Sequence, residues 1–88
     1  MKKYLIKETT TATENNKNFK GITKIFYVGK KENAMEKEEY LNYHFLNNGF
    51  TTKAAATKAL KHYVENCEWF NNTFKTWTSV YEIIEKEF

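Results

Sequence analysis

The residues best suited to covalent chemistry in this chain are one cysteine, Cys67, and two histidines, His44 and His62. A thiol activated by an imidazole is a common nucleophile, and the two groups must lie within hydrogen-bonding reach. Cys67 falls on the apolar side of a predicted helix, where a thiol packs as a small hydrophobic group, whereas His62 lies five residues earlier and off that side. His44 stands between two aromatic residues and is predicted to be structural. We therefore predict no catalytic residues and no enzyme activity.

Metal and cofactor sites have recognisable spacings, and the sequence contains none of them. One cysteine and two histidines cannot complete the four nitrogen or sulfur ligands of a structural zinc site. The three glycines form no phosphate-binding loop, and neither a G-x-S-x-G nor an H-E-x-x-H pattern occurs. No metal ligand and no cofactor are predicted.

The same single cysteine bears on the cellular compartment. It excludes an internal disulfide and, with no secretory leader in view, it favours a reducing environment, so a cytoplasmic location is expected. No apolar run approaches the roughly 20 residues that span a bilayer, and we expect no membrane association.

The charged residues are of two types only, because all 14 basic residues are lysine and all 11 acidic residues are glutamate. Residues 1–37 carry a net charge of +5 (nine lysines minus four glutamates) and residues 38–88 a net charge of −2 (five minus seven). Lysine acts as a flexible point charge, whereas arginine supplies the fork that reads guanine edges. This composition disfavours sequence-specific recognition of duplex DNA.

One segment resembles a nucleic-acid motif. Residues 20–27, KGITKIFY, partly match the octamer of the RNA recognition motif, but Ile22 and Lys24 stand where stacking aromatics are expected. The chain also lacks the βαββαβ order of that fold. Nucleic-acid binding remains an alternative function.

Alternating and apolar segments predict the sheet. Residues 3–8 alternate with a period of two and predict a strand, and residues 9–18 predict a polar connection. Residues 22–28 are apolar on both faces, which is typical of an interior strand. Residues 32–48 allow either a strand, favoured over 40–46 by its aromatics, or a helix with an Asn33 N-cap that ends at Asn48 and Gly49.

Helical periodicity is clearest after Thr52. Apolar residues recur at positions i, i+3, i+4, i+7, i+8 and i+11, with Leu60 near the centre of the stripe, which predicts an amphipathic helix to about Phe70 capped by Thr51 or Thr52. Residues 77–85 predict a final strand beside the first strand or in the centre of the sheet. The chain is thus predicted to be one α+β domain over residues 1–88, in β-β-β-α-β order, with an antiparallel sheet of three to four strands and one long helix on one face.

One face of such a sheet lacks a helix, and the sequence has more large apolar residues than a single helix can cover. Exposed aromatic patches often mark protein interfaces, so binding of a foreign protein or homodimerisation is expected, unless loops and residues 32–48 cover the second face. We predict that Lys24, Tyr27, Lys30 and Lys31 bind the partner, with Tyr27 as the anchor and the lysines as steering charges.

The segments KKYLIKE, FYVGK, GFTTKAAATKAL and VYEII together resemble small accessory proteins of phages and prophages, of the kind that includes anti-CRISPR and other anti-defence inhibitors. This resemblance implies stoichiometric inhibition by occupying a surface of a host nuclease or effector complex, without catalysis. Many such inhibitors mimic DNA with an acidic surface, which a net charge of +3 does not match. The expected function is therefore a protein-binding module, plausible as an inhibitor of a CRISPR nuclease or another host protein, with a nucleic-acid-binding regulator and a structural homo-oligomer as the alternatives.

Overall fold

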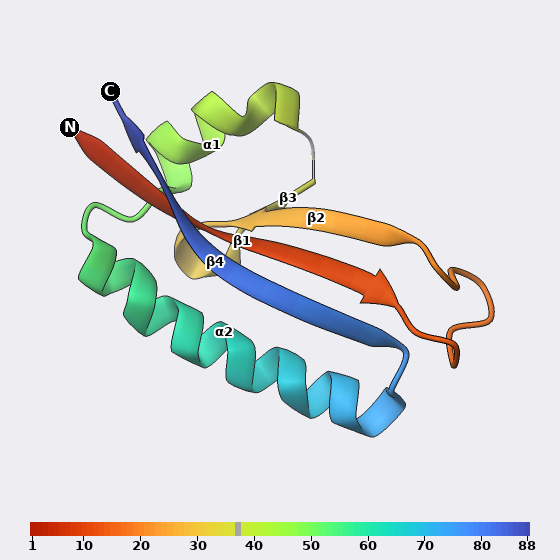
Figure 1. Cartoon of the computed structure of the whole chain (residues 1–88). Coiled ribbons are helices and arrows are strands. Elements are labelled where there is room, and N and C mark those ends of the chain that lie inside the picture. Colours follow the sequence, from red (N-terminus) through yellow and green to blue (C-terminus); the bar gives the residue numbers. More distant parts are fainter. Residues whose placement is uncertain (37) are drawn as a thin grey trace.

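The computed structural model describes residues 1–36 and 38–88. A four-stranded antiparallel sheet, in the order β3-β2-β1-β4, separates two α-helices (Figure 1). The elements are β1 (Lys2–Ala12), β2 (Thr23–Val28), the 3-10 turn η1 (Lys30–Glu32), β3 (Ala34–Met35), the 3-10 turn η2 (Glu38–Tyr40), α1 (Leu41–Asn48), α2 (Lys53–Phe74) and β4 (Trp77–Glu87). The predicted α+β class and antiparallel sheet are confirmed.

β1 is the central long strand, and its pairing brings basic residues of the first half of the chain next to acidic residues of the second half. It pairs with β4 along its whole length, from Lys2 opposite Glu87 to Ala12 opposite Trp77. This places the basic start of the chain beside the acidic end, and Lys7 lies 3.7 Å from Glu82. Such exposed cross-strand pairs are each worth about 0.2–1 kcal/mol, so each adds little to stability.

Successive residues of β1 face opposite helices, and each face has its own core. On the α2 side, Ile6 packs with Val28, Phe50 and Ala56. On the α1 side, Leu5 packs with Tyr27 and Phe45. The molecule therefore has three layers at the end where the chain termini lie together, rather than the two layers expected from a single covering helix.

The strand favoured for residues 40–46 is wrong, because this segment forms η2 and α1. Phe45 and His44 are buried and Leu41 is partly buried, and this spacing of three and four residues suits a helix rather than a strand. The helical alternative placed the end correctly at Asn48, where the Gly49 amide bonds to the Phe45 carbonyl, but Asn33 ends η1 instead of capping α1. The third strand is the two-residue β3.

The other boundaries move by a few residues. β1 continues to Ala12, because the threonines after Glu8 are β-branched and complete the ladder with β2 and β4. α2 begins where predicted, since the Thr52 hydroxyl accepts a hydrogen bond from the Ala55 amide. β4 occupies the first of its two predicted positions, beside β1. No helix among the described residues is both long and apolar enough to cross a membrane.

Candidate functional site

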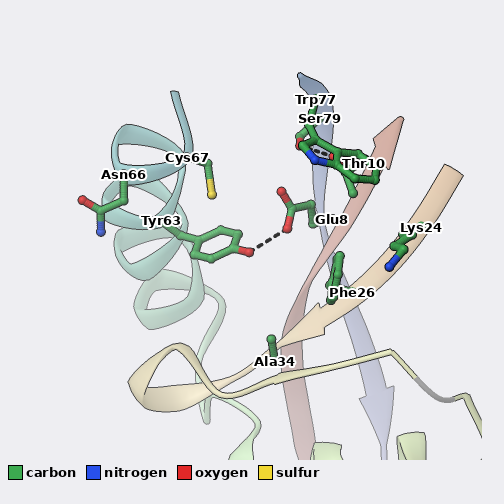
Figure 2. A pocket seen from close by; sticks show the side chains of 10 residues that line it. All are labelled: Glu8, Thr10, Lys24, Phe26, Ala34, Tyr63, Asn66, Cys67, Trp77 and Ser79. Carbon is green, nitrogen blue, oxygen red and sulfur yellow. Dashed lines mark hydrogen bonds between the residues drawn. The ribbon is translucent and has the colours of Figure 1, made fainter. Parts of the chain in front are cut away.

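A groove opens on the α2 side of the sheet, because α2 packs on β1 and β4 and covers β2 only at its end, where Val28 packs with Ala56. We call it the Glu8 groove, and it has a volume of about 560 Å³. Figure 2 shows its lining, which consists of Glu8, Thr10, Lys24, Phe26, Ala34, Tyr63, Asn66, Cys67, Trp77 and Ser79. The size lies within the range of small-molecule sites.

The carboxylate of Glu8 forms the polar floor of this groove. Glu8 is only 6% exposed, and one of its oxygens accepts a hydrogen bond of 2.6 Å from the Tyr63 hydroxyl. None of the ion pairs formed between described residues includes Glu8. Burial raises the pKa of Tyr63, and the hydrogen bond and negative charge of Glu8 raise that pKa further. Tyr63 therefore remains a hydrogen-bond donor to the carboxylate at neutral pH.

Two aromatic residues that line the groove, Tyr63 and Trp77, each pack against a second aromatic ring. Tyr63 meets Tyr81 edge to face, with ring centres 5.9 Å apart. Burial, followed by interaction with the Cys67 side chain, raises the pKa of Tyr81. Trp77 packs against Phe19 from the loop between β1 and β2, also with a centre-to-centre distance of 5.9 Å. These two aromatic pairs therefore hold lining residues of the groove in place from different elements of the fold.

The structure does not bring the cysteine and the histidines together. Cys67 is half-buried and lines the groove, rather than lying deep in the core as predicted from the apolar stripe. His62 is exposed. His44 is buried on the opposite side of the sheet, where its Nε2 lies 2.7 Å from the Tyr27 carbonyl oxygen and its Nδ1 lies 3.0 Å from the Asn48 amide nitrogen. Within the residues described here, no three potential metal-ligating side chains gather.

The four residues predicted to bind a partner are divided between two places. Lys24 and Tyr27 border one hollow along the outer edge of β2, and Lys30 and Lys31 border another beside the end of α1. Lys24 lies 3.8 Å from Glu36, and its ammonium lies 5.3 Å from the centre of the Phe19 ring.

Tyr27 does not have the exposure expected of an anchor residue. It is 3% exposed, packs in the α1-side core and donates a hydrogen bond to Glu38. The ring was assigned to a binding surface because apolar residues occur on both sides of β2, and the sequence does not show that α1 covers this one. The free chain therefore presents the lysines to solvent but keeps the Tyr27 ring in its core.

A second candidate surface lies on the α1 side of the sheet, beyond the end of α1. It consists of two cross-strand rows, Ile25–Thr9–Val80 and Thr23–Thr11–Thr78, which we call the distal face. Every residue in it is uncharged and β-branched. Val80 is 72% exposed and Ile25 is 37% exposed. The 32–48 segment thus covers only the half of this sheet face near the chain termini.

The Glu8 groove was not identified from the sequence, whereas an uncovered sheet face was predicted without the two rows that form the distal face. Glu8 could have been noticed as a carboxylate on the same side of β1 as the core residue Ile6, but β1 was predicted to end there. Comparisons of the chain with protein-family models, with curated proteins and with solved structures find no match.

Proposed function

We propose that this chain is a non-enzymatic protein-binding module that docks on another protein through the distal face. The observation that supports this proposal is the pair of regular rows of uncharged, β-branched residues on a half-covered sheet, in which the outer residues Thr23, Ile25, Thr78 and Val80 are exposed and the central Thr9 and Thr11 are partly exposed. Burying such a surface requires no charge to lose its water, and it gains roughly 25 cal/mol per Å² of apolar area. Ile25 and Val80 are the apolar residues of this face, and exposed apolar side chains that lie in one patch often mark interaction sites.

The chemistry of the rim indicates what kind of surface would fit. The row next to the distal face contains Lys7 and Glu82, which neutralise each other across the strands. On the same side of the sheet, α1 carries exposed Tyr43 and Leu46, which are suitable as additional apolar contacts. A flat, uncharged surface on a folded protein would be complementary to this arrangement.

The resemblance to anti-defence inhibitors suggests the class of partner, a host nuclease or effector complex that is blocked by occupation of its surface. Direct binding to phosphates is less favoured, because Lys2, Lys7 and Lys24 each lie within 4.0 Å of a glutamate. We propose the inhibitor as the specific form of the protein-binding module.

The test compares two variants that add the same charge at different surfaces. Val80→Glu places a carboxylate in the distal face, whereas Ala54→Glu places one at an exposed position in the first turn of α2. Each tagged protein is used to capture partners from a nuclease-treated lysate of its bacterial host, and the bound proteins are identified by mass spectrometry.

We expect the original chain and Ala54→Glu to retain the same stoichiometric protein and Val80→Glu to lose it. Retention by all three would show that docking does not use the distal face. Loss of all captured material on nuclease treatment would favour the nucleic-acid regulator, and a Val80-dependent dimer in gel filtration would favour the homo-oligomer.

A further inference from the structure

The polar floor of the Glu8 groove is not explained by folding. On the α2 side of β1, Glu8 follows Ile6, which is buried in the core, and both residues are shielded from water. Burying a carboxylate is costly unless a cation or several donors compensate, and the described residues provide one donor, the Tyr63 hydroxyl. Residues that cost stability in this way are often kept for function.

We infer that the Glu8 groove binds an alkylammonium group, with its ammonium at the Glu8 carboxylate and its alkyl chain among the aromatic side chains. This inference does not depend on the distal face, which lies on the other side of the sheet. The alkylammonium is carried either by a free small amine or by a lysine side chain of another protein.

The acceptors in the groove match an ammonium group, which has three donors and no acceptor. Figure 2 shows the Glu8 side chain pointing from the sheet towards Tyr63 and Cys67 of α2, so its carboxylate faces the space between the sheet and the helix. Ser79 adds a second acceptor, because its hydroxyl donates to the Thr10 hydroxyl at 2.9 Å and retains its lone pairs. Thr10 in turn donates to the Thr78 carbonyl.

The rest of the lining suits the body of such a ligand. Phe26, Tyr63 and Trp77 line the groove from three different elements. Aromatic rings attract cations through their negative faces and also pack against methylene groups. A neutral or anionic ligand of the same size would leave the buried carboxylate without compensation.

Among the described residues that line the groove, Lys24 carries the one positive charge, so it competes for the same carboxylate. Its ammonium lies 3.8 Å from Glu36 and over the Phe19 ring, so its charge is held at the rim instead of at Glu8. Replacing Lys24 with methionine keeps an unbranched side chain of nearly the same length and removes the charge. This variant should bind an external amine at least as tightly as the original chain.

The experiment uses Trp77 as a reporter. The chain has two tryptophans, and Trp69→Phe removes the exposed one, so that fluorescence reports on the groove. This reporter protein is titrated with n-pentylamine at neutral pH and with pentan-1-ol as the neutral control, and Nα-acetyl-lysine methylamide represents the lysine side chain. Amide chemical shifts from NMR locate the binding site.

We expect saturable binding of an amine probe, no comparable binding of the alcohol, and a loss of affinity of about tenfold or more in Glu8→Gln, because a charge-assisted bond is lost. Tyr63→Phe should retain binding, since it removes a competing donor but leaves the carboxylate. Preference for pentylamine would indicate a free amine as ligand, and preference for the lysine derivative would indicate a protein side chain.

The inference is overturned if pentylamine and pentanol bind alike, if neither amine probe binds, or if Glu8→Gln binds as the reporter protein does. Shifts confined to exposed glutamates, such as Glu65 and Glu68, would overturn it as well. Glu8→Gln is nearly isosteric, and its NMR spectrum shows whether the fold is retained. If Glu8→Gln does not fold, the affinity of Lys24→Met for the amine decides. Competition by Lys24 predicts that this variant binds the amine as tightly as the reporter protein or more tightly, and a weaker affinity contradicts the site.

Discussion

The Tyr63 hydroxyl of α2 lies 2.6 Å from a carboxylate oxygen of Glu8 on β1, which joins the long helix to the central strand by a polar contact. Burial of the phenol raises the pKa of Tyr63 first, and the bond and charge of Glu8 raise it further. The folded chain therefore holds this proton more tightly than the unfolded chain, in which a tyrosine titrates near pH 10.

This difference predicts an alkaline loss of stability. A group whose folded pKa is raised stabilises the fold fully below its unfolded pKa, and the contribution is lost as pH rises towards the folded value. The free energy of unfolding should therefore fall from about pH 10 upwards. Tyr63→Phe removes this titration, so its stability should decline less steeply in urea unfolding series between about pH 8 and about pH 11. Parallel declines in the two proteins would contradict this.

At neutral pH the same variant measures the bond itself. Tyr63→Phe keeps the ring packing against Tyr81 but leaves Glu8 without its hydroxyl donor. Hydrogen bonds to charged groups contribute about 1.5–3 kcal/mol, and we expect Tyr63→Phe to lower the free energy of unfolding by an amount near the lower end of that range. Tyr43→Phe, at an exposed position on α1, is the matched control and should be nearly neutral.

Tyr27 provides a test of the core on the α1 side. Because its ring is 3% exposed and packs with Leu5 and Phe45, Tyr27→Ala should cost about 3–5 kcal/mol. Tyr27→Phe removes only the hydrogen bond to Glu38, and because the Glu38 carboxylate is exposed and can bond to water instead, the cost should be about 0.5–1.5 kcal/mol. Urea unfolding measures both variants. A small effect of Tyr27→Ala would mean that the ring is available to a partner, as the sequence alone suggested.

The burial of Leu60 depends on where α2 lies on the sheet as well as on the periodicity of the helix. It lies near the centre of the apolar stripe of α2, but it is only partly buried, whereas Ile6 of β1 is 1% exposed. We expect Ile6→Ala to cost about 2–5 kcal/mol and Leu60→Ala about 1–2 kcal/mol. Thermal or urea unfolding that gives equal losses would place Leu60 in the fully packed core.

The predictions of α2 and β4 were confirmed because each rests on a residue pattern that extends over many positions. The α2 stripe covers six positions, and the threonine cap at its start is a local interaction that needs no tertiary contact. β4 was predicted from β-branched and aromatic residues that are frequent in strands. These elements determine the α+β class.

α1 was predicted wrongly because its eight residues have no clear amphipathic pattern. Tyr43 and Leu46 are exposed although apolar, and His44 is fully buried although polar, so both alternate and helical spacings are present. What decides between them is tertiary: the His44 imidazole bonds to the Tyr27 carbonyl, and Phe45 packs on Leu5. A single sequence contains neither contact.

The Glu8 groove depends equally on tertiary placement. It exists because α2 lies mainly across β1 and β4 and reaches β2 only at Val28, and no local pattern specifies that offset. The lining comes from residues far apart in the chain, such as Glu8 and Trp77, which meet through the antiparallel register of β1 and β4. The same register creates the two rows of the distal face.

Gly29, which follows β2, lies against Asn48 at the end of α1, and this close contact predicts the effect of a substitution. A Cβ added to Gly29 would lie 2.4 Å from the Asn48 carbonyl oxygen, and backbone cannot move aside as a flexible side chain does. Gly29→Ala should therefore destabilise the protein by about 1–3 kcal/mol and loosen α1, which circular dichroism and urea unfolding can measure. Gly21→Asn is the control, because Gly21 has a positive φ that asparagine tolerates and no atom within 4 Å of an added Cβ. If Gly29→Ala proves as stable as the control, α1 cannot lie against Gly29, and the burial of Tyr27 beneath it would also be in doubt.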